Sequence, residues 1–243
     1  MVCCVERRTL DTLTARYRSG EIMRSRSVSA VVRTAVVDLP TPPARLLADW
    51  QREISGQLGL EPGDIEPLAL GRTRLRWPEL RRCRDAVGKW LDALAMPNVL
   101  GSSELALMAS RGTAYHHDGA RYGGTAFCNV FLGEDSGADL HFPAAGHRIA
   151  LGRGRVLVFD PCQPHAIIKR GAVGFEAADF ATGLMHPQVF LTWELPIEHD
   201  EVKRALTIAV DPVPLASWQD QDEQVLRNGA PVKLCPKTGS WNC

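Results

Sequence analysis

The chain has 243 residues, and its 28 basic and 28 acidic side chains cancel, so the formal net charge is zero. This balance gives no strong nucleic-acid signal, because proteins of that class usually carry a positive field. No apolar run is long enough to predict a membrane span. The seven cysteines are scattered without a CxxC pair, which is typical of reduced thiols and favours a cytoplasmic location.

Composition divides the chain into three parts. Residues 1–29 are rich in arginine and serine and poor in large apolar residues, so we expect a disordered N-terminal extension. Residues 30–210 hold the periodic patterns of one folded domain. Residues 211–243 form a C-terminal tail with two tryptophans, Trp218 and Trp241, and because these rings need burial we expect the tail to pack on the domain.

Within the domain, strand patterns outnumber helical ones. The β-branched stretch 31–39 predicts a first strand, and amphipathic helices are predicted at 44–58 and 78–95. Further strands are predicted at 104–109, 126–142 (two strands and a hairpin), 147–151, 156–159 and 188–195. The fold class is therefore mainly β with flanking helices (α+β), and we expect the helices to cover one face of an antiparallel sheet.

The segment Tyr115 to Gly119 carries the clearest chemical signal. His116 and Asp118 are two residues apart, so on a β-strand their side chains lie on the same face. His165, where an apolar strand, a turn and a new apolar run meet, offers a second imidazole. Two histidines and a carboxylate form the facial triad of non-haem Fe(II) oxygenases, although the short motif alone also fits a polar loop.

Further landmarks follow this motif in order. They are a hydrophobic strand at 126–133, a Gly-containing piece that closes on Phe142-Pro143, Gly152-Arg153 before an apolar strand, and the distal His165. Over residues 103–195 the series resembles the prolyl-4-hydroxylase-like branch of the 2-oxoglutarate and Fe(II)-dependent dioxygenases.

This resemblance implies a double-stranded β-helix, the jelly-roll class. It implies that His116, Asp118 and His165 are the catalytic residues and hold Fe(II). It also implies 2-oxoglutarate as cosubstrate, with release of succinate and CO2, and ascorbate as a candidate reductant. The reaction would be hydroxylation or desaturation of a small-molecule or peptidyl substrate.

The residue that binds the far carboxylate of 2-oxoglutarate departs from the family pattern. The family places a lysine or arginine at the start of the strand after the distal histidine, where this chain has Gln188. A buried carboxylate needs a charged partner, so another part of the chain must supply a cation. The candidates are Lys169, Arg170, Arg155 and Arg121.

Strand order favours Arg170 as this cation, with Gln188, Thr192 and Asn129 as neutral contacts to the cosubstrate. The insertion 171–187 is expected to form a loop over the mouth of the barrel. Two other functions stay open: a jelly-roll metal-binding protein without oxygenase activity, and a cupin-like metalloenzyme that does not use 2-oxoglutarate. The sequence does not predict the oligomeric state.

Overall fold

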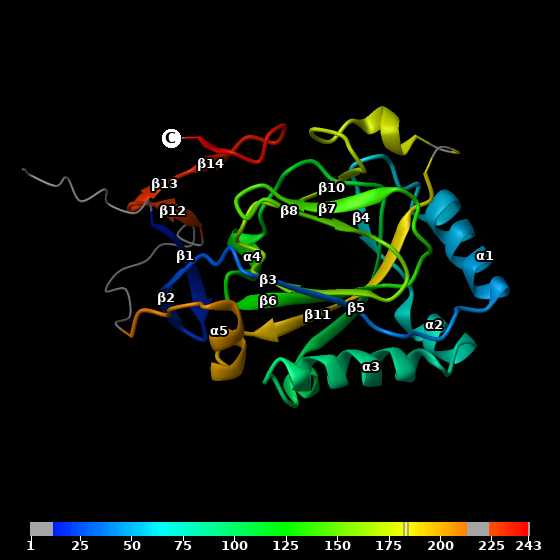
Figure 1. Cartoon of the computed structure of the whole chain (residues 1–243), viewed down its shortest axis with the longest axis horizontal. Helices are drawn as coiled ribbons and strands as arrows, with labels where there is room; N and C mark the ends of the chain where they lie inside the picture. The colour runs from blue at the N-terminus through cyan, green and yellow to red at the C-terminus, as the bar shows by residue number, and fades with distance from the viewer. Residues whose placement is uncertain (1–11, 182, 184, 213–223, 243) are drawn as a thin grey trace, which may run out of the picture.

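Two antiparallel sheets enclose the centre of the molecule (Figure 1). The computed structural model describes residues 12–181, 183, 185–212 and 224–242. The larger sheet has the strand order β3-β9-β6-β11-β5-β4, and the smaller one the order β10-β7-β8. The strands of the larger sheet are β3 (Val32–Val36), β4 (Ile65–Pro67), β5 (Glu104–Ser110), β6 (Thr125–Phe131), β9 (Arg155–Phe159) and β11 (Gln188–Pro196). Those of the smaller sheet are β7 (Ala138–Phe142), β8 (His147–Ala150) and β10 (Ala166–Lys169).

The two faces of β11 explain why the larger sheet packs as it does. One face carries four buried apolar residues that belong to the main hydrophobic core: Val189, Leu191, Trp193 and Leu195. The alternate residues Phe190, Thr192 and Glu194 point to the other side, toward the smaller sheet. Because side chains alternate along a strand, one sequence supplies both a core and an inner wall.

Helices cover the outer face of the larger sheet (Figure 1). They are α1 (Ala44–Arg52), which continues as the π-helical turn η1 (Glu53–Gln57), α2 (Leu70–Arg76), α3 (Leu80–Ala93) and the short 3-10 turn η2 (Val99–Gly101). Helix α3 buries Leu80, Cys83, Val87 and Leu91, at the three- and four-residue spacing that predicted it. The mainly β architecture with flanking helices agrees with the sequence, and no described helix has the length and apolarity to cross a membrane.

The N-terminal segment departs from the sequence-based expectation. Strands β1 (Leu13–Ser19) and β2 (Ile22–Ser27) form a hairpin in a separate four-stranded sheet with β12 (Val225–Arg227) and β13 (Ala230–Pro231). The expectation of disorder is therefore wrong for residues 13–27, because the few apolar side chains there are well placed for burial, Tyr17 and Met23 among them. Residues 1–11 lie outside the described part of the chain.

The C-terminal segment 224–242 runs beside the His116 region. Its last strands are β14 (Lys233–Leu234) and β15 (Trp241–Asn242). The carbonyl of Pro236 accepts a hydrogen bond from the Tyr115 N–H, at 3.1 Å, and the rings of Trp241 and His117 lie 5.1 Å apart. Helix α5 (Asp200–Leu206) precedes this segment, and Trp218 falls outside the described residues.

Candidate active site

His116, Asp118 and His165 meet at one end of the space between the two sheets. His116 and His165 form an isolated antiparallel bridge in which each N–H donates to the other's carbonyl, at 3.1 and 3.0 Å. This pairing sets their imidazoles side by side, with ring centroids 4.4 Å apart. Asp118 lies at the residue before the short helix α4 (Gly119–Tyr122), and its N–H donates to Pro161.

The ligand atoms of the three side chains converge. One ligand atom from each lies within 4.8 Å of the others, and Asp118 Oδ2 is 3.5 Å from His165 Nε2 and 3.9 Å from His116 Nε2. His116 and Asp118 do not lie on one face of a strand, as the sequence predicted, because the chain leaves the bridge and enters α4 at Asp118. The turn nevertheless brings the carboxylate to the same point.

Backbone acceptors fix both imidazoles. His116 Nδ1 lies 2.9 Å from the carbonyl of Ala114, and His165 Nδ1 lies 3.0 Å from that of Gln163. A carbonyl accepts but cannot donate, so each Nδ1 carries the proton and each Nε2 presents a lone pair. This is the arrangement by which partners outside the ligand set orient metal-binding histidines.

The charge states also suit a divalent metal. Burial, and then the neighbouring His165, lower the pKa of His116 from 6.5 to about 4, so this imidazole is neutral at neutral pH. Burial alone would raise the pKa of Asp118, but its interactions with the nearby imidazoles, His165 first, outweigh burial and lower that pKa below 3.8. Two imidazole nitrogens and an ionised carboxylate form the donor set of a facial triad, which fits Fe(II).

A buried ion pair supports the loop that carries His165. The Arg26 guanidinium pairs with Asp160 through two contacts, of 2.7 and 2.9 Å, and both side chains are fully buried. Asp160 also accepts from the N–H of Cys162, and Arg26 Nε donates to the carbonyl of Gly123. The pair therefore joins the β1–β2 hairpin both to the segment before His165 and to the end of α4.

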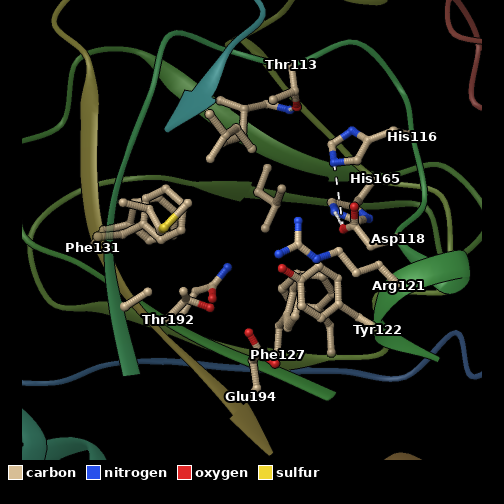
Figure 2. A pocket seen from close by; sticks show the side chains of 18 residues that line it. Thr113, His116, Asp118, Arg121, Tyr122, Phe127, Phe131, His165, Thr192 and Glu194 are labelled. Carbon is tan, nitrogen blue, oxygen red and sulfur yellow. Dashed lines mark hydrogen bonds and ion pairs between the residues drawn. The ribbon is translucent and has the colours of Figure 1, made fainter. Parts of the chain in front are cut away.

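The three side chains open into a cavity of about 280 Å³ between the sheets (Figure 2). Apolar side chains line much of it, among them Ile65, Met108, Phe131, Leu140, Ile167 and Phe190. The polar side chains that line it besides the triad are Thr113, Arg121, Tyr122, Asn129, Thr192 and Glu194. The cavity thus combines apolar walls with a few polar groups, as small-molecule sites commonly do.

Two of the four predicted cosubstrate contacts lie in this cavity. Asn129 on β6 and Thr192 on β11 both line it and are register partners across the strands. Arg170 does not line it, and pairs with Asp135 and Asp139 at 3.0 and 2.9 Å. Arg170 lies outside the cavity because β10 leads the chain away from the triad, by roughly 3.3 Å per residue.

Gln188 is also separated from the cavity. It is buried and faces the same side of β11 as Phe190, but its Nε2 donates to Ser136 Oγ. The rings of Phe131 and Phe190, which both line the cavity, lie 5.1 Å apart, and Gln188 is not among the lining residues. A ligand in the cavity would therefore meet Thr192 and not Gln188.

Arg121 is the one of the four candidate cations that lines the cavity. Figure 2 shows its side chain reaching from α4 toward the centre of the cavity. Lys169 pairs instead with Asp179, and Arg155 Nε donates to the Ala150 carbonyl. The sequence did contain a signal that Arg121 lies at the site: it follows Asp118 by three residues, which is about one helical turn.

Glu194 is a site residue that sequence reasoning missed. It lines the cavity two residues beyond Thr192, on the same face of β11. Period-two alternation would have placed it there, since Val189, Leu191, Trp193 and Leu195 mark the opposite face. No described residue of the insertion 171–187 lines the cavity; Phe180, in the 3-10 turn η3 (Ala177–Phe180), packs into the core with Phe175 stacked on it.

No protein-family model and no curated protein matches the chain. Solved structures do resemble it. The collagen prolyl hydroxylase of Paramecium bursaria Chlorella virus-1 aligns with 11% identity and a TM-score of 0.39, over 68% of this chain and 88% of that one. A Pseudomonas putida prolyl-4-hydroxylase gives 16% identity and 0.39, over 68% and 92%.

A third similar structure is SnoN, the non-haem α-ketoglutarate-dependent epimerase of nogalamycin biosynthesis, with 14% identity and a TM-score of 0.32, over 83% of this chain and 90% of that one. Two of the three are prolyl hydroxylases.

Proposed function

We propose that the chain is an Fe(II)- and 2-oxoglutarate-dependent dioxygenase that hydroxylates or desaturates a small-molecule or peptidyl substrate. The convergence of His116, Asp118 and His165 on one point at the edge of a cavity carries this proposal. We further propose that the two facing sheets form a double-stranded β-helix, the jelly-roll class, with the triad at one end.

The three side chains would hold the metal from one side and leave its other positions open to the cavity. Bound Fe(II), with 2-oxoglutarate and dioxygen, would supply an oxidant able to remove hydrogen from a C–H bond, with release of succinate and CO2. The protein's own part is orientation. The Ala114 and Gln163 carbonyls hold the imidazoles in place, and apolar side chains such as Phe131 and Phe190 form part of the cavity wall.

Arg121 is the residue that we assign to the far carboxylate of 2-oxoglutarate, in place of Arg170. A carboxylate in a largely apolar cavity requires a charged hydrogen-bonding partner. The Arg121 guanidinium has no hydrogen bond or ion pair within the described part of the chain, and its Cζ lies 5.2 Å from the centre of the Tyr122 ring. Asn129 and Thr192 on the facing wall would add neutral hydrogen bonds.

The test is conversion of 2-oxoglutarate to succinate by the purified protein with Fe(II), dioxygen and ascorbate, in the absence of a prime substrate. We expect slow succinate release that disappears in Asp118→Ala and persists in Arg170→Ala. If iron binds but no succinate forms under any condition, the chain is a metal-binding protein or a metalloenzyme of the cupin type that does not use 2-oxoglutarate.

A further inference from the structure

The wall of the cavity formed by β11 and β6 presents hydrogen-bond acceptors that have no donor. Glu194 is half-buried, lines the cavity, and has no hydrogen-bond or ion-pair partner in the part of the chain that the structure describes. Asn129 lines the same cavity and is 7% exposed, and its buried Oδ1 has no partner either. Two unsatisfied acceptors on neighbouring strands call for a ligand that donates.

The surroundings of Glu194 favour a positively charged donor. Its register partner on β5 is Glu104, a second carboxylate on the same face of the sheet. Burial, and then this neighbouring charge, raise the pKa of Glu194, while Arg121 lowers it. The register partner on the other side is Phe127, whose ring packs against Tyr122 at 4.9 Å. Carboxylates beside aromatic rings form a common environment for ammonium groups.

The charges in the cavity indicate that Arg121 and Glu194 bind different ligands. No ion pair joins them among the described residues, although both line the cavity. With the proposed cofactors bound, the divalent metal and Arg121 together offset Asp118 and the dianionic keto acid. Among the described residues that line the cavity, Glu194 is then a carboxylate with no ion-pair partner, and a neutral or anionic substrate would leave it unpaired at a cost.

We propose that Glu194, with Asn129 on the neighbouring strand, binds a protonated aliphatic amine of the prime substrate. This inference rests on the proposed function, because the assignment of Arg121 to the keto acid is part of the charge balance. The amine belongs either to a free alkylamine or to a peptidyl lysine side chain, which share the same terminal chemistry.

The experiment compares probes that differ only in the end group: n-pentylammonium, n-pentanol and pentanoate. Binding to the full chain, loaded with Zn(II) and 2-oxoglutarate so that no turnover occurs, is measured by ligand-observed NMR. We expect the ammonium to bind about tenfold tighter than the alcohol, and pentanoate to bind more weakly than both. In Glu194→Gln the preference for the ammonium should disappear.

Glu66→Gln is the matched control, because Glu66 is exposed on β4 and does not line the cavity. Thermal unfolding of both variants checks that they fold. Equal binding of ammonium and alcohol, tighter binding of pentanoate, or a preference that survives in folded Glu194→Gln would overturn the inference. N-acetyl-lysine methylamide, run beside pentylammonium, distinguishes a peptidyl from a free amine, and tighter binding of either supports the proposal.

The outcome is separable from that of the proposed function. Glu194-dependent amine binding without any succinate formation would keep this subsite and remove the oxygenase assignment. Succinate formation without amine preference would keep the oxygenase and remove the subsite.

Discussion

At the metal end of the cavity, backbone carbonyls hold the two imidazoles, whereas on the wall formed by β11 and β6 two acceptors that face the cavity have no partner among the described residues. The Nδ1 atoms of His116 and His165 are fixed by carbonyls, and the loop before His165 is held by the buried Arg26–Asp160 pair. On the wall, Glu194 and Asn129 Oδ1 have no partner among the described residues.

This difference indicates that the two parts of the cavity have different functions, one holding the metal and the other recognising small molecules. Ligands of a catalytic metal must be held in position before the metal arrives, so their orientation is built into the backbone. Groups that recognise small molecules have their hydrogen bonds completed by those molecules. The unpaired wall residues are therefore where substrate and cosubstrate specificity should reside.

The largest expected effect comes from removing the support of the metal end. Asp160→Ala leaves the Arg26 charge buried and unpaired, which should lower the free energy of unfolding by about 3–5 kcal/mol. Urea denaturation of the metal-free protein measures this. Glu134→Ala, which removes an exposed ion pair with Arg153, is the control and should cost about 1 kcal/mol or less. An equal fall in the free energy of unfolding in the two variants would show that the buried Arg26–Asp160 pair does not stabilise the metal end.

The second effect concerns the metal ligands. Removal of a residue that merely orients a ligand typically costs about 10- to 100-fold in metal affinity, so His116→Ala and His165→Ala should each cost more than that. Anaerobic Fe(II) titration measures the affinity. His147→Ala is the control, because His147 is exposed on β8. Unchanged affinity in both triad variants would remove the metal centre from these residues.

Arg121 provides the third effect, on the wall side of the comparison. Arg121→Ala should weaken 2-oxoglutarate binding about tenfold or more, since a charged hydrogen bond is lost, while Fe(II) affinity stays unchanged. Equilibrium binding of 2-oxoglutarate to the Zn(II)-loaded protein measures this without turnover. Arg170→Ala should have no effect, because Arg170 pairs with Asp135 and Asp139 outside the cavity. Weaker 2-oxoglutarate binding in Arg170→Ala, with no change in Arg121→Ala, would instead support Arg170 as the cation that binds the cosubstrate.

The sequence predicted the metal end better than the wall, for a physical reason. His116 and Asp118 are two residues apart in the chain and His165 borders an apolar run, so chemistry and position are both visible in the sequence. Arg121 and Arg170 could not be ranked in this way, because the direction in which β10 carries the chain depends on tertiary structure. Glu194 was accessible from the alternation of β11, but only once its inner face was known.

The N-terminal hairpin illustrates a second limit. Its burial depends on pairing between β1 and β12, which are separated by most of the chain, so local composition gave no sign of it. Arg26 belongs to the segment that was expected to be disordered, but in the structure it is fully buried against Asp160.

A separate expected effect, on stability and not on binding, is a pH dependence of the metal-free protein. The pKa of His116 is about 4 in the folded chain against an ordinary 6.5. Between these values the unfolded state binds more protons, so the free energy of unfolding should fall as pH falls from 6.5 toward 4. Urea unfolding at several pH values measures the slope, which should be shallower in His116→Asn. An identical slope in that variant would mean that other groups carry the dependence.

The central claim, that one cavity holds both iron and the keto acid, is tested most directly by anaerobic optical titration. Chelation of Fe(II) by a 2-keto acid produces a visible charge-transfer band that neither partner gives alone. We predict that the band appears when 2-oxoglutarate is added to the Fe(II)-loaded protein, is absent in His165→Ala, and requires more 2-oxoglutarate in Arg121→Ala. Iron binding without this band at saturating 2-oxoglutarate would contradict the claim.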